Sequence, residues 1–345
     1  MAIIDKPSDF FNPKIYTGNG GTQSITGVGF QPDWVWVKQR GGTTNHKTSD
    51  SVRGATKALQ PNDTDAEATD SNGITAFNSD GFSLGAGGDY NSSSASQVAW
   101  NWKAGTSFTN DASATGIGTI DSTGSVSQET GFSIVSYSGT GNLGTVAHSL
   151  GATPKMLFVR KRNTAENWLV YNEKLTASNY LLLNTTGASG ADNMWNSTSP
   201  TSSVFTVNAV DGANGSGGNY IAYCFADVQG YSKFSSYVGN GNADGTFVYT
   251  GFKPAWVMVK NTNAVNHWAI YDNKRIGFNT ENNYLRADGS YAEGSETWGD
   301  FDLLSNGFKP RATDAMINSS GNTFIYMAFA ENPFVASNFN AATAR

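Results

Sequence analysis

The stretch GFQPDWVWVK, from Gly29 to Lys38, decides the fold because it occurs three times. It returns as GATPKMLFVRK from Gly151 to Lys161 and as GFKPAWVMVK from Gly251 to Lys260. In each copy a proline leads a run of large or β-branched side chains that ends in a basic residue. Such a run is typical of a β-strand covered on both faces. We call it the anchor strand, and its repetition predicts three copies of one unit.

The segments around the anchor strand repeat in the same order. Glycine-rich turns precede the three anchors and begin at Tyr16, Tyr137 and Tyr237. Closing strands end the three units and read VAWNWKA at 98–104, IAYCFA at 221–226 and IYMAFA at 325–330. After each anchor comes a segment centred on Asn, in which we take His46 and His267 as equivalent, with Trp168 beside the matching Asn of the second copy. Agreement at so many landmarks supports the triplication.

Between the landmarks the pattern has mostly period two. Turn signals such as Asn72-Gly73 and Asn306-Gly307 separate the short apolar runs. We therefore predict an all-β fold of tandem antiparallel β-sandwiches, jelly-roll or lectin-like, in three copies. A propeller is the weaker alternative, because three blades are fewer than propellers usually have.

The copies also suggest domain boundaries. We expect a first sandwich with a short N-terminal arm in residues 1–105, a second in 131–229, and a third with a C-terminal tail in 230–345. Residues 106–130 are rich in Ser, Thr and Gly and are expected to form a linker. On this view each copy has its own core, the first stands apart, and the other two pack as a pair.

The composition excludes several classes of protein. Of 345 residues only 14% are charged and 12% are aromatic, which argues against disorder and against helical bundles. The net charge of −6, with scattered basic residues, gives no reason to expect a nucleic-acid partner. Apolar runs are too short to span a membrane, and the start MAIIDKPSDFFNPK does not read as a secretory leader.

Residues able to support catalysis are few. The three histidines (His46, His148 and His267) do not occur at metal-ligand spacing, and Cys224 lies alone in an apolar run. Glycoside hydrolysis needs two facing carboxylates, which sequence alone does not reveal. The acidic stretch from Asp63 to Asp70 lacks the Gly and Glu of a calcium loop, so we expect a solvated loop. We expect no enzyme activity, no cofactor and no metal.

Two tryptophans, Trp195 in NMWNSTS and Trp298 in ETWGDFD, lie in polar surroundings. Each could stack on a sugar ring while neighbouring amides bind its hydroxyls. The alternative, which we favour, is that each one plugs the open end of its sandwich.

Several long phrases, among them FQPDWVWVKQR, SDSVRGATKAL, FNSDGFSLG, TPKMLFVRKR, YSKFSSYVGNG and FIYMAFAENPF, resemble a family of tailed-bacteriophage virion structural proteins. That family is common in marine phages, including cyanophages, and its members are usually described as tail-fibre-like. The resemblance runs from about Tyr16 to Phe334. It implies a virion component without enzyme activity, assembled in the host cytoplasm and released by lysis.

Three functions stay open at this stage. The first is a fibre or appendage, exposed on the particle, that contacts host-surface glycans. The second is a capsid decoration or cement protein that stabilises the head, and the third, more remote, is a glycan-cleaving spike. Expected partners are other virion proteins, a host cell-surface glycan, and further copies of the chain, for which phage appendages suggest a trimer. We expect no membrane partner.

Overall fold

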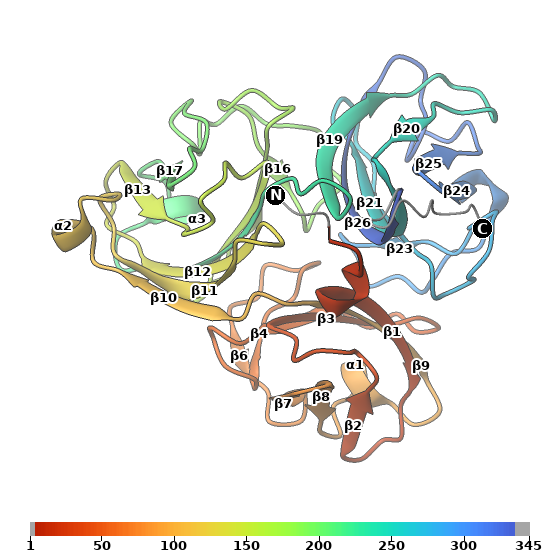
Figure 1. The fold of residues 1–345 in the computed structure, drawn as a ribbon, viewed down its shortest axis with the longest axis horizontal. Coiled ribbons are helices and arrows are strands. Elements are labelled where there is room, and N and C mark those ends of the chain that lie inside the picture. The colour runs from red at the N-terminus through yellow and green to blue at the C-terminus, as the bar shows by residue number, and fades with distance from the viewer. Residues whose placement is uncertain (1–3, 335–345) are drawn as a thin grey trace.

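The computed structural model describes residues 4–334, and almost all of its regular structure is β-strand. The strands form three lobes around a common centre, coloured red to orange, yellow to green, and teal to blue in Figure 1. Each lobe is one repeat, in residues 11–102, 106–225 and 232–333. The prediction of an all-β fold built from antiparallel, sandwich-type sheets is confirmed.

In the first repeat a four-stranded sheet packs against a three-stranded one. The larger sheet has the order β1 (Phe11–Thr17), β9 (Ser96–Trp102), β3 (Trp34–Gln39) and β4 (Lys47–Asp50). The smaller sheet has the order β2 (Gln23–Thr26), β8 (Gly81–Leu84) and β7 (Ile74–Asn78). The short elements are η1 (Pro7–Asp9), β5 (Lys57–Ala58), β6 (Ala68–Thr69) and α1 (Gly88–Asn91).

The second repeat follows the same plan with three additional strands in its larger sheet and one fewer in its smaller sheet. Its larger sheet has the order β10 (Thr106–Asn110), β11 (Ser122–Ser127), β12 (Phe132–Ser138), β18 (Asn219–Phe225), β14 (Met156–Lys161), β15 (Trp168–Asn172) and β16 (Leu181–Leu182). The smaller sheet pairs β13 (Gly144–Ala147) with β17 (Val204–Val207). Its two short helices are α2 (Ala112–Thr115) and α3 (Asp211–Asn214).

The third repeat has five strands in its larger sheet. Their order is β19 (Ser232–Val238), β26 (Thr323–Pro333), β21 (Phe252–Asn261), β22 (Trp268–Asp272) and β23 (Leu285–Arg286). The smaller sheet has the order β20 (Val248–Tyr249), β25 (Gly307–Pro310) and β24 (Phe301–Leu304), and η2 (Thr297–Gly299) directly precedes β24 in the chain. In every repeat the closing strand (β9, β18 or β26) thus lies between the anchor strand and one other strand, which is β1, β12 or β19.

Strand register defines which residues of the three repeats are equivalent. The first large apolar residue after the proline of each anchor strand pairs with an acidic or amide residue, namely Trp34 with Asp50, Met156 with Asn172, and Trp256 with Asp272. His46, Trp168 and Trp268 each lie four residues before this acidic or amide residue, so the three are equivalent. The expected equivalence of His46 and His267 is therefore wrong by one residue, and the adjacent Asn-His pairs of the two copies concealed the shift.

The anchor strand has two apolar faces because it separates two cores. In the first repeat Val35 and Val37 point into the core between its two sheets. Trp34 and Trp36, on the opposite face, belong to a core that includes residues of all three repeats. Alternation of side chains along a strand sends neighbouring residues to different cores.

The larger sheets of the three repeats enclose this shared core together. Trp34 stacks on Tyr223 of the second repeat, with ring centroids 4.5 Å apart. Trp102 packs edge-on against Trp256 of the third repeat at 5.9 Å, and Phe225 meets Phe329 at 6.2 Å. Each repeat therefore buries large aromatic surface against both others. The expectation that the first repeat stands apart while the other two form a pair is wrong.

Residues 106–130 do not form a linker. They contribute β10, α2 and β11, and β11 pairs along its length with β12 of the second repeat. Asp111 caps α2 by accepting the N–H groups of Ser113 and Ala114, and Gly116 ends it with a left-handed φ of 67°. One face of this hairpin meets solvent and most of its residues are polar, so its composition resembles that of a loop.

The N-terminal segment closes one end of the shared core. Ile4 is buried there, and Phe11 stacks on Phe329 of the third repeat at 4.8 Å. Phe10 packs edge-on against Tyr231 at 6.3 Å. The described part of the expected N-terminal arm is therefore integrated into the body of the protein.

Buried charges connect the first and second repeats. Tyr223 Oη donates a hydrogen bond to Asp50 Oδ2 (2.7 Å), and Arg53 pairs with the same carboxylate. Glu67 accepts two hydrogen bonds from Arg162 of the second repeat, each 2.9 Å long. Burial disfavours ionisation of Glu67, but the two arginines outweigh it and hold its pKa below the usual value. The acidic stretch that was expected to be a solvated loop therefore joins two repeats.

The interface between the third and first repeats is built in the same way. Arg275 Nε donates to Asp272 Oδ2 (2.7 Å), and Trp100 Nε1 of the first repeat donates to the same oxygen (3.0 Å). Arg40 of the first repeat makes two contacts with Glu293, of 3.0 and 2.8 Å.

The interface between the second and third repeats replaces these charges by neutral groups. The residues equivalent to Asp272, Arg275 and Trp100 are Asn172, Leu175 and Met327. The same geometric position thus accepts either a buried ion pair or uncharged side chains.

Candidate functional site

Three ring N–H positions close the end of the shared core that lies opposite the N-terminal segment. Each lies within hydrogen-bond distance of a main-chain carbonyl in the preceding repeat: Trp168 Nε1 and Gln60 O (2.8 Å), Trp268 Nε1 and Leu182 O (3.0 Å), His46 Nε2 and Arg286 O (3.0 Å). The first repeat thus bonds to the third, and the cycle is complete.

His46 takes part in this cycle as a neutral side chain. Trp36 Nε1 donates to His46 Nδ1 (2.8 Å), so Nδ1 is the acceptor and the proton resides on Nε2, facing the Arg286 carbonyl. Burial lowers the pKa of His46 well below its usual value, and Lys38 adds to the effect. The role of His46 is structural.

An open polar cavity of about 530 Å³ lies directly outside this cycle. We call it the axial pocket, because residues of all three repeats line it: Asn45, Asn62, Asp63, Asn184, Thr185, Thr186, His267, Asp288, Gly289, Ser290 and Tyr291. Its volume falls within the roughly 300–1,000 Å³ common for small-molecule sites.

Equivalent side chains of the three repeats shape the axial pocket. Each accepts a main-chain N–H at the start of the strand that follows the anchor: Asn62 from His46 (2.8 Å), Asn184 from Trp168 (2.9 Å) and Asp288 from Trp268 (2.7 Å). The amides of Asn62 and Asn184 also donate to Asn45 and Asn167, each over 2.9 Å. Hydrogen bonding on both sides fixes these amides, so the pocket is formed before any ligand arrives.

The third repeat places a carboxylate and an imidazole where the other repeats have two amides. His267 Nδ1 lies 2.6 Å from Asp288 Oδ2, and the Asp288 side chain is buried while His267 is partly exposed. A neutral imidazole that donates through Nδ1 leaves Nε2 as an acceptor. The Ser290 hydroxyl shares the pocket, but among residues 4–334 it makes no hydrogen bond to this imidazole. The pair is therefore arranged to bind a hydroxyl group.

An aromatic rim extends from the pocket. The Arg286 guanidinium lies over the rings of Tyr284, Tyr291 and Trp298, at 5.3, 4.8 and 5.9 Å from their centroids. Tyr291 and Trp298 are 47% and 37% exposed, so part of each ring faces solvent. Arg286 thus links the pocket residue Tyr291 to Trp298.

The two tryptophans singled out in the sequence have different environments. Trp195 is 1% exposed and packs edge-on against Tyr171 (5.9 Å) in the core of the second repeat. It cannot stack on an external sugar, so that hypothesis is wrong for Trp195 and the packing alternative applies. Trp298 stays accessible on the rim.

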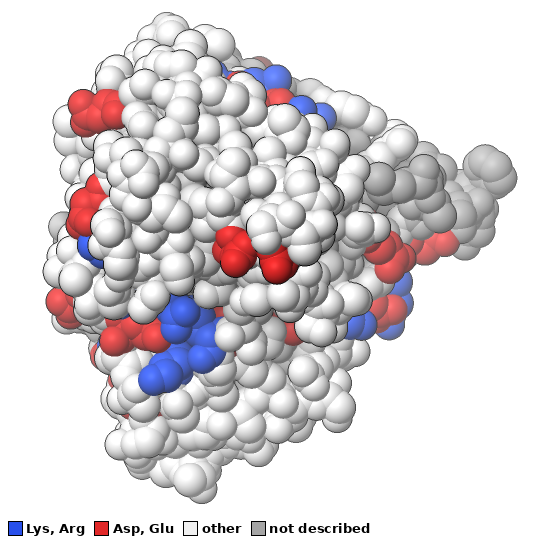
Figure 2. Space-filling model, turned by 90° about the vertical axis from the view of Figure 1, so that its left-hand side faces the viewer, with Lys and Arg blue, Asp and Glu red and all other residues white. Residues whose placement is uncertain are grey.

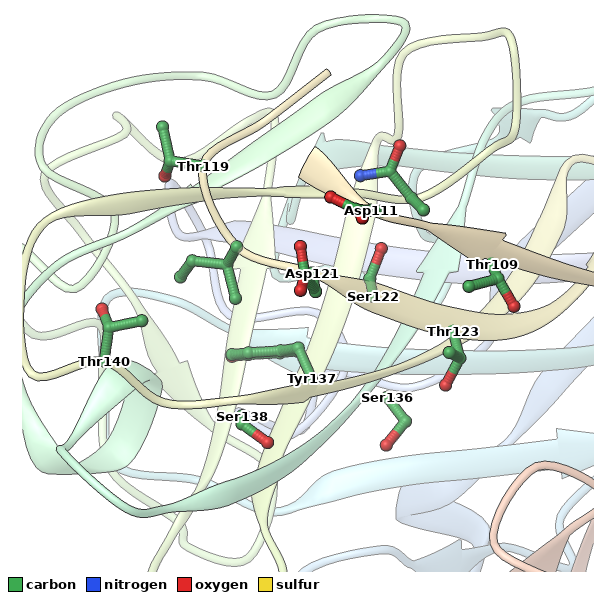
Figure 3. Close-up of a pocket in the computed structure, with 12 residues that line it drawn as sticks. Thr109, Asp111, Thr119, Asp121, Ser122, Thr123, Ser136, Tyr137, Ser138 and Thr140 are labelled. Atoms are coloured by element: carbon green, nitrogen blue, oxygen red, sulfur yellow. The ribbon is translucent and has the colours of Figure 1, made fainter. Parts of the chain in front are cut away.

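A second groove, of about 610 Å³, belongs to the second repeat alone (Figure 3). Asp111 and Asp121 both line it, as a glycan-cleaving site would need. Their oxygens accept main-chain N–H groups around α2, Asp121 from Ala112 (2.9 Å). Hydrogen bonds from the Ser113 hydroxyl and the Ala114 N–H hold the pKa of Asp111 below its usual value. Asp111 is therefore not suited to act as a general acid at neutral pH, and the hydrogen bonds around α2 give both carboxylates a role in the fold.

Other reactive groups give no further site. Burial raises the pKa of the Cys224 thiol to about 12, so this thiol is protonated and unreactive. Within residues 4–334, no group of three or more His, Cys, Asp or Glu side chains could hold a metal ion. No helix in that range is long and apolar enough to cross a membrane.

A family model described as a domain of unknown function (DUF7483) matches residues 6–333. The chain belongs to the DUF7483 family. Because the match runs from η1 to the end of β26, the DUF7483 domain is the complete body of three repeats. Neither the curated proteins nor the solved structures compared with it gave a match.

Proposed function

We propose that the chain is a structural protein of a tailed-phage virion, without enzyme activity, exposed as a fibre or appendage that contacts host-surface glycans. The resemblance of several long phrases to those of phage virion proteins supports the location on a particle. The observation that carries the contact with glycans is the axial pocket, which is open, preformed and rich in amides and hydroxyls. Figure 2 supports a recognition mode with little steering by charge, because charged residues occur in small separate groups on a mostly white face.

Capsid decoration is the second candidate, but the described N-terminal segment gives it less support. A cement protein would gain from an arm that reaches over the shell, whereas residues 4–11 pack on the chain's own third repeat.

Immunogold electron microscopy of intact particles, with an antibody against this chain, tests the proposal. We expect label at the tail tip or on projecting fibres. Label spread evenly over the head would replace the proposal by capsid decoration, and purified particles without label would refute a virion protein altogether. Uninfected host lysate is the matched control.

A further inference from the structure

We propose that the axial pocket binds one terminal pyranose of a neutral glycan per chain, with Tyr291 as the stacking surface. This inference rests on the proposed function for its biological ligand. It adds the class of sugar, the stoichiometry and the residues that bind it.

The pocket is open on its outer side, and the cycle of ring N–H groups lies behind its lining, because Asn62, Asn184 and Asp288 each bind the main-chain N–H of one ring residue of the cycle. Behind that cycle lies the shared apolar core, with fully buried side chains such as Trp36 and Trp268. A ligand therefore enters from the outer end and stops at the cycle. This geometry suits the end of a glycan chain.

The lining selects for uncharged, hydroxyl-rich groups. Amides and hydroxyls of Asn45, Asn184 and Thr185 supply both donors and acceptors, which is what sugar hydroxyls need. Lys and Arg are absent from the residues that line the pocket, whereas Asp63 and Asp288 belong to them. A carboxylated or sulfated sugar would meet these two carboxylates in the lining itself, and repulsion would weaken its binding.

Tyr291 makes the site asymmetric. It is the only Phe, Tyr or Trp among the lining residues, and nearly half of its surface is exposed. The Arg286 guanidinium lies over its ring, and the His267 ring meets it edge-on at 5.4 Å. A ring held in this way can present its free face to the C–H groups of a pyranose without losing further side-chain entropy.

His267 gives the same wall a directed polar group. Its contact with Asp288 orients the imidazole, and Nε2 makes no hydrogen bond within residues 4–334, so it can bind a sugar hydroxyl. The first and second repeats have Asn45 and Asn167 at the equivalent position. Because only the third repeat places this imidazole and Tyr291 at the pocket, we expect one sugar per chain and not three.

The test uses the full chain with a fluorescent label on an array of neutral and acidic oligosaccharides. Isothermal titration with the best neutral oligosaccharide then gives the stoichiometry. We expect neutral ligands, one per chain, and a loss of affinity of at least tenfold in Tyr291→Ala. Tyr249→Ala is the matched control, because Tyr249 is a more exposed tyrosine of the same repeat outside the pocket lining. His267→Asn, which copies the other repeats, should retain part of the affinity.

Binding restricted to acidic glycans, three sites per chain, unchanged affinity in Tyr291→Ala, or no glycan binding would each overturn the inference. The two proposals fail separately. If the antibody labels fibres but the chain binds no glycan, only the sugar site is refuted. If the chain binds the sugar but particles carry no label, only the location on the virion is refuted.

Discussion

Replacing Asp272 by Asn should destabilise the protein by about 3–5 kcal/mol, the usual cost of removing one partner of a buried ion pair. Arg275 and Asp272 are both fully buried, and Arg275 Nε lies 2.7 Å from Asp272 Oδ2. In the variant the guanidinium keeps Glu293, 3.1 Å away, but loses the carboxylate of residue 272. Arg275→Leu should cost a similar amount, because it leaves the Asp272 carboxylate with only the Trp100 indole and main-chain donors.

The double variant Asp272→Asn/Arg275→Leu should be more stable than either single variant. It reproduces Asn172 and Leu175, which occupy the equivalent positions in the second repeat. Both buried charges disappear together, and the remaining cost is a weaker hydrogen bond from Trp100, about 1–2 kcal/mol. The coupling free energy between the two substitutions should therefore exceed about 2 kcal/mol.

Urea denaturation at pH 7, followed by tryptophan fluorescence and circular dichroism, measures all three variants. Glu173→Gln is the control, because its partner Lys155 is partly exposed and the loss should stay within about 1 kcal/mol. Additive single effects, or a cost below about 1 kcal/mol for Asp272→Asn, would refute the role of this buried pair in supporting the interface with the first repeat.

The remaining predictions concern the shared core, the histidines and the tryptophans. A fragment of residues 131–345 should be molten, because it exposes the core surface that the first repeat covers; a sharp near-ultraviolet circular dichroism spectrum without dye binding would contradict this. Burial lowers the pKa of His148 to about 4 from 6.5, so its contribution to stability is present above pH 6.5 and is lost as the pH falls to 4. The loss should amount to about 3 kcal/mol, and His148→Gln should show less dependence on pH over this range in urea titrations. Trp195→Ala should cost about 3–5 kcal/mol in the same assay and Trp298→Ala clearly less, because only Trp195 is buried; equal costs would argue against the two environments described.

The sequence was a good guide to local structure. The anchor run Trp34 to Lys38 predicted a strand with two covered faces, and both faces are indeed buried. What covers the outer face depends on contacts between repeats, which no local pattern encodes. The hairpin in residues 106–130 was missed for a different reason, since its solvent-facing residues give it the composition of a loop.

The axial pocket could not be predicted from the sequence. Asn45, Asn184 and Asp288 come from three distant segments, and they meet only because the repeats close around one axis. The Asn-centred segment after each anchor strand was the available signal. It marked the region, although the third-copy equivalent of Asn45 and Asn167 is His267, and it gave no indication that the three segments form one cavity.

Because the three repeats belong to one chain, a residue of one repeat can be substituted without the same substitution in the other two. In an assembly of three identical subunits, every substitution near the axis would occur three times, and three bulky Tyr291 side chains would compete for the same space. A single chain can carry one tyrosine and one imidazole at the axis and keep amides in the other two positions. The same freedom allows Asn172 and Leu175 in one interface while its two counterparts keep their ion pairs. The chain thus has the closed packing of a trimer, while each of its three repeats can carry different residues at equivalent positions.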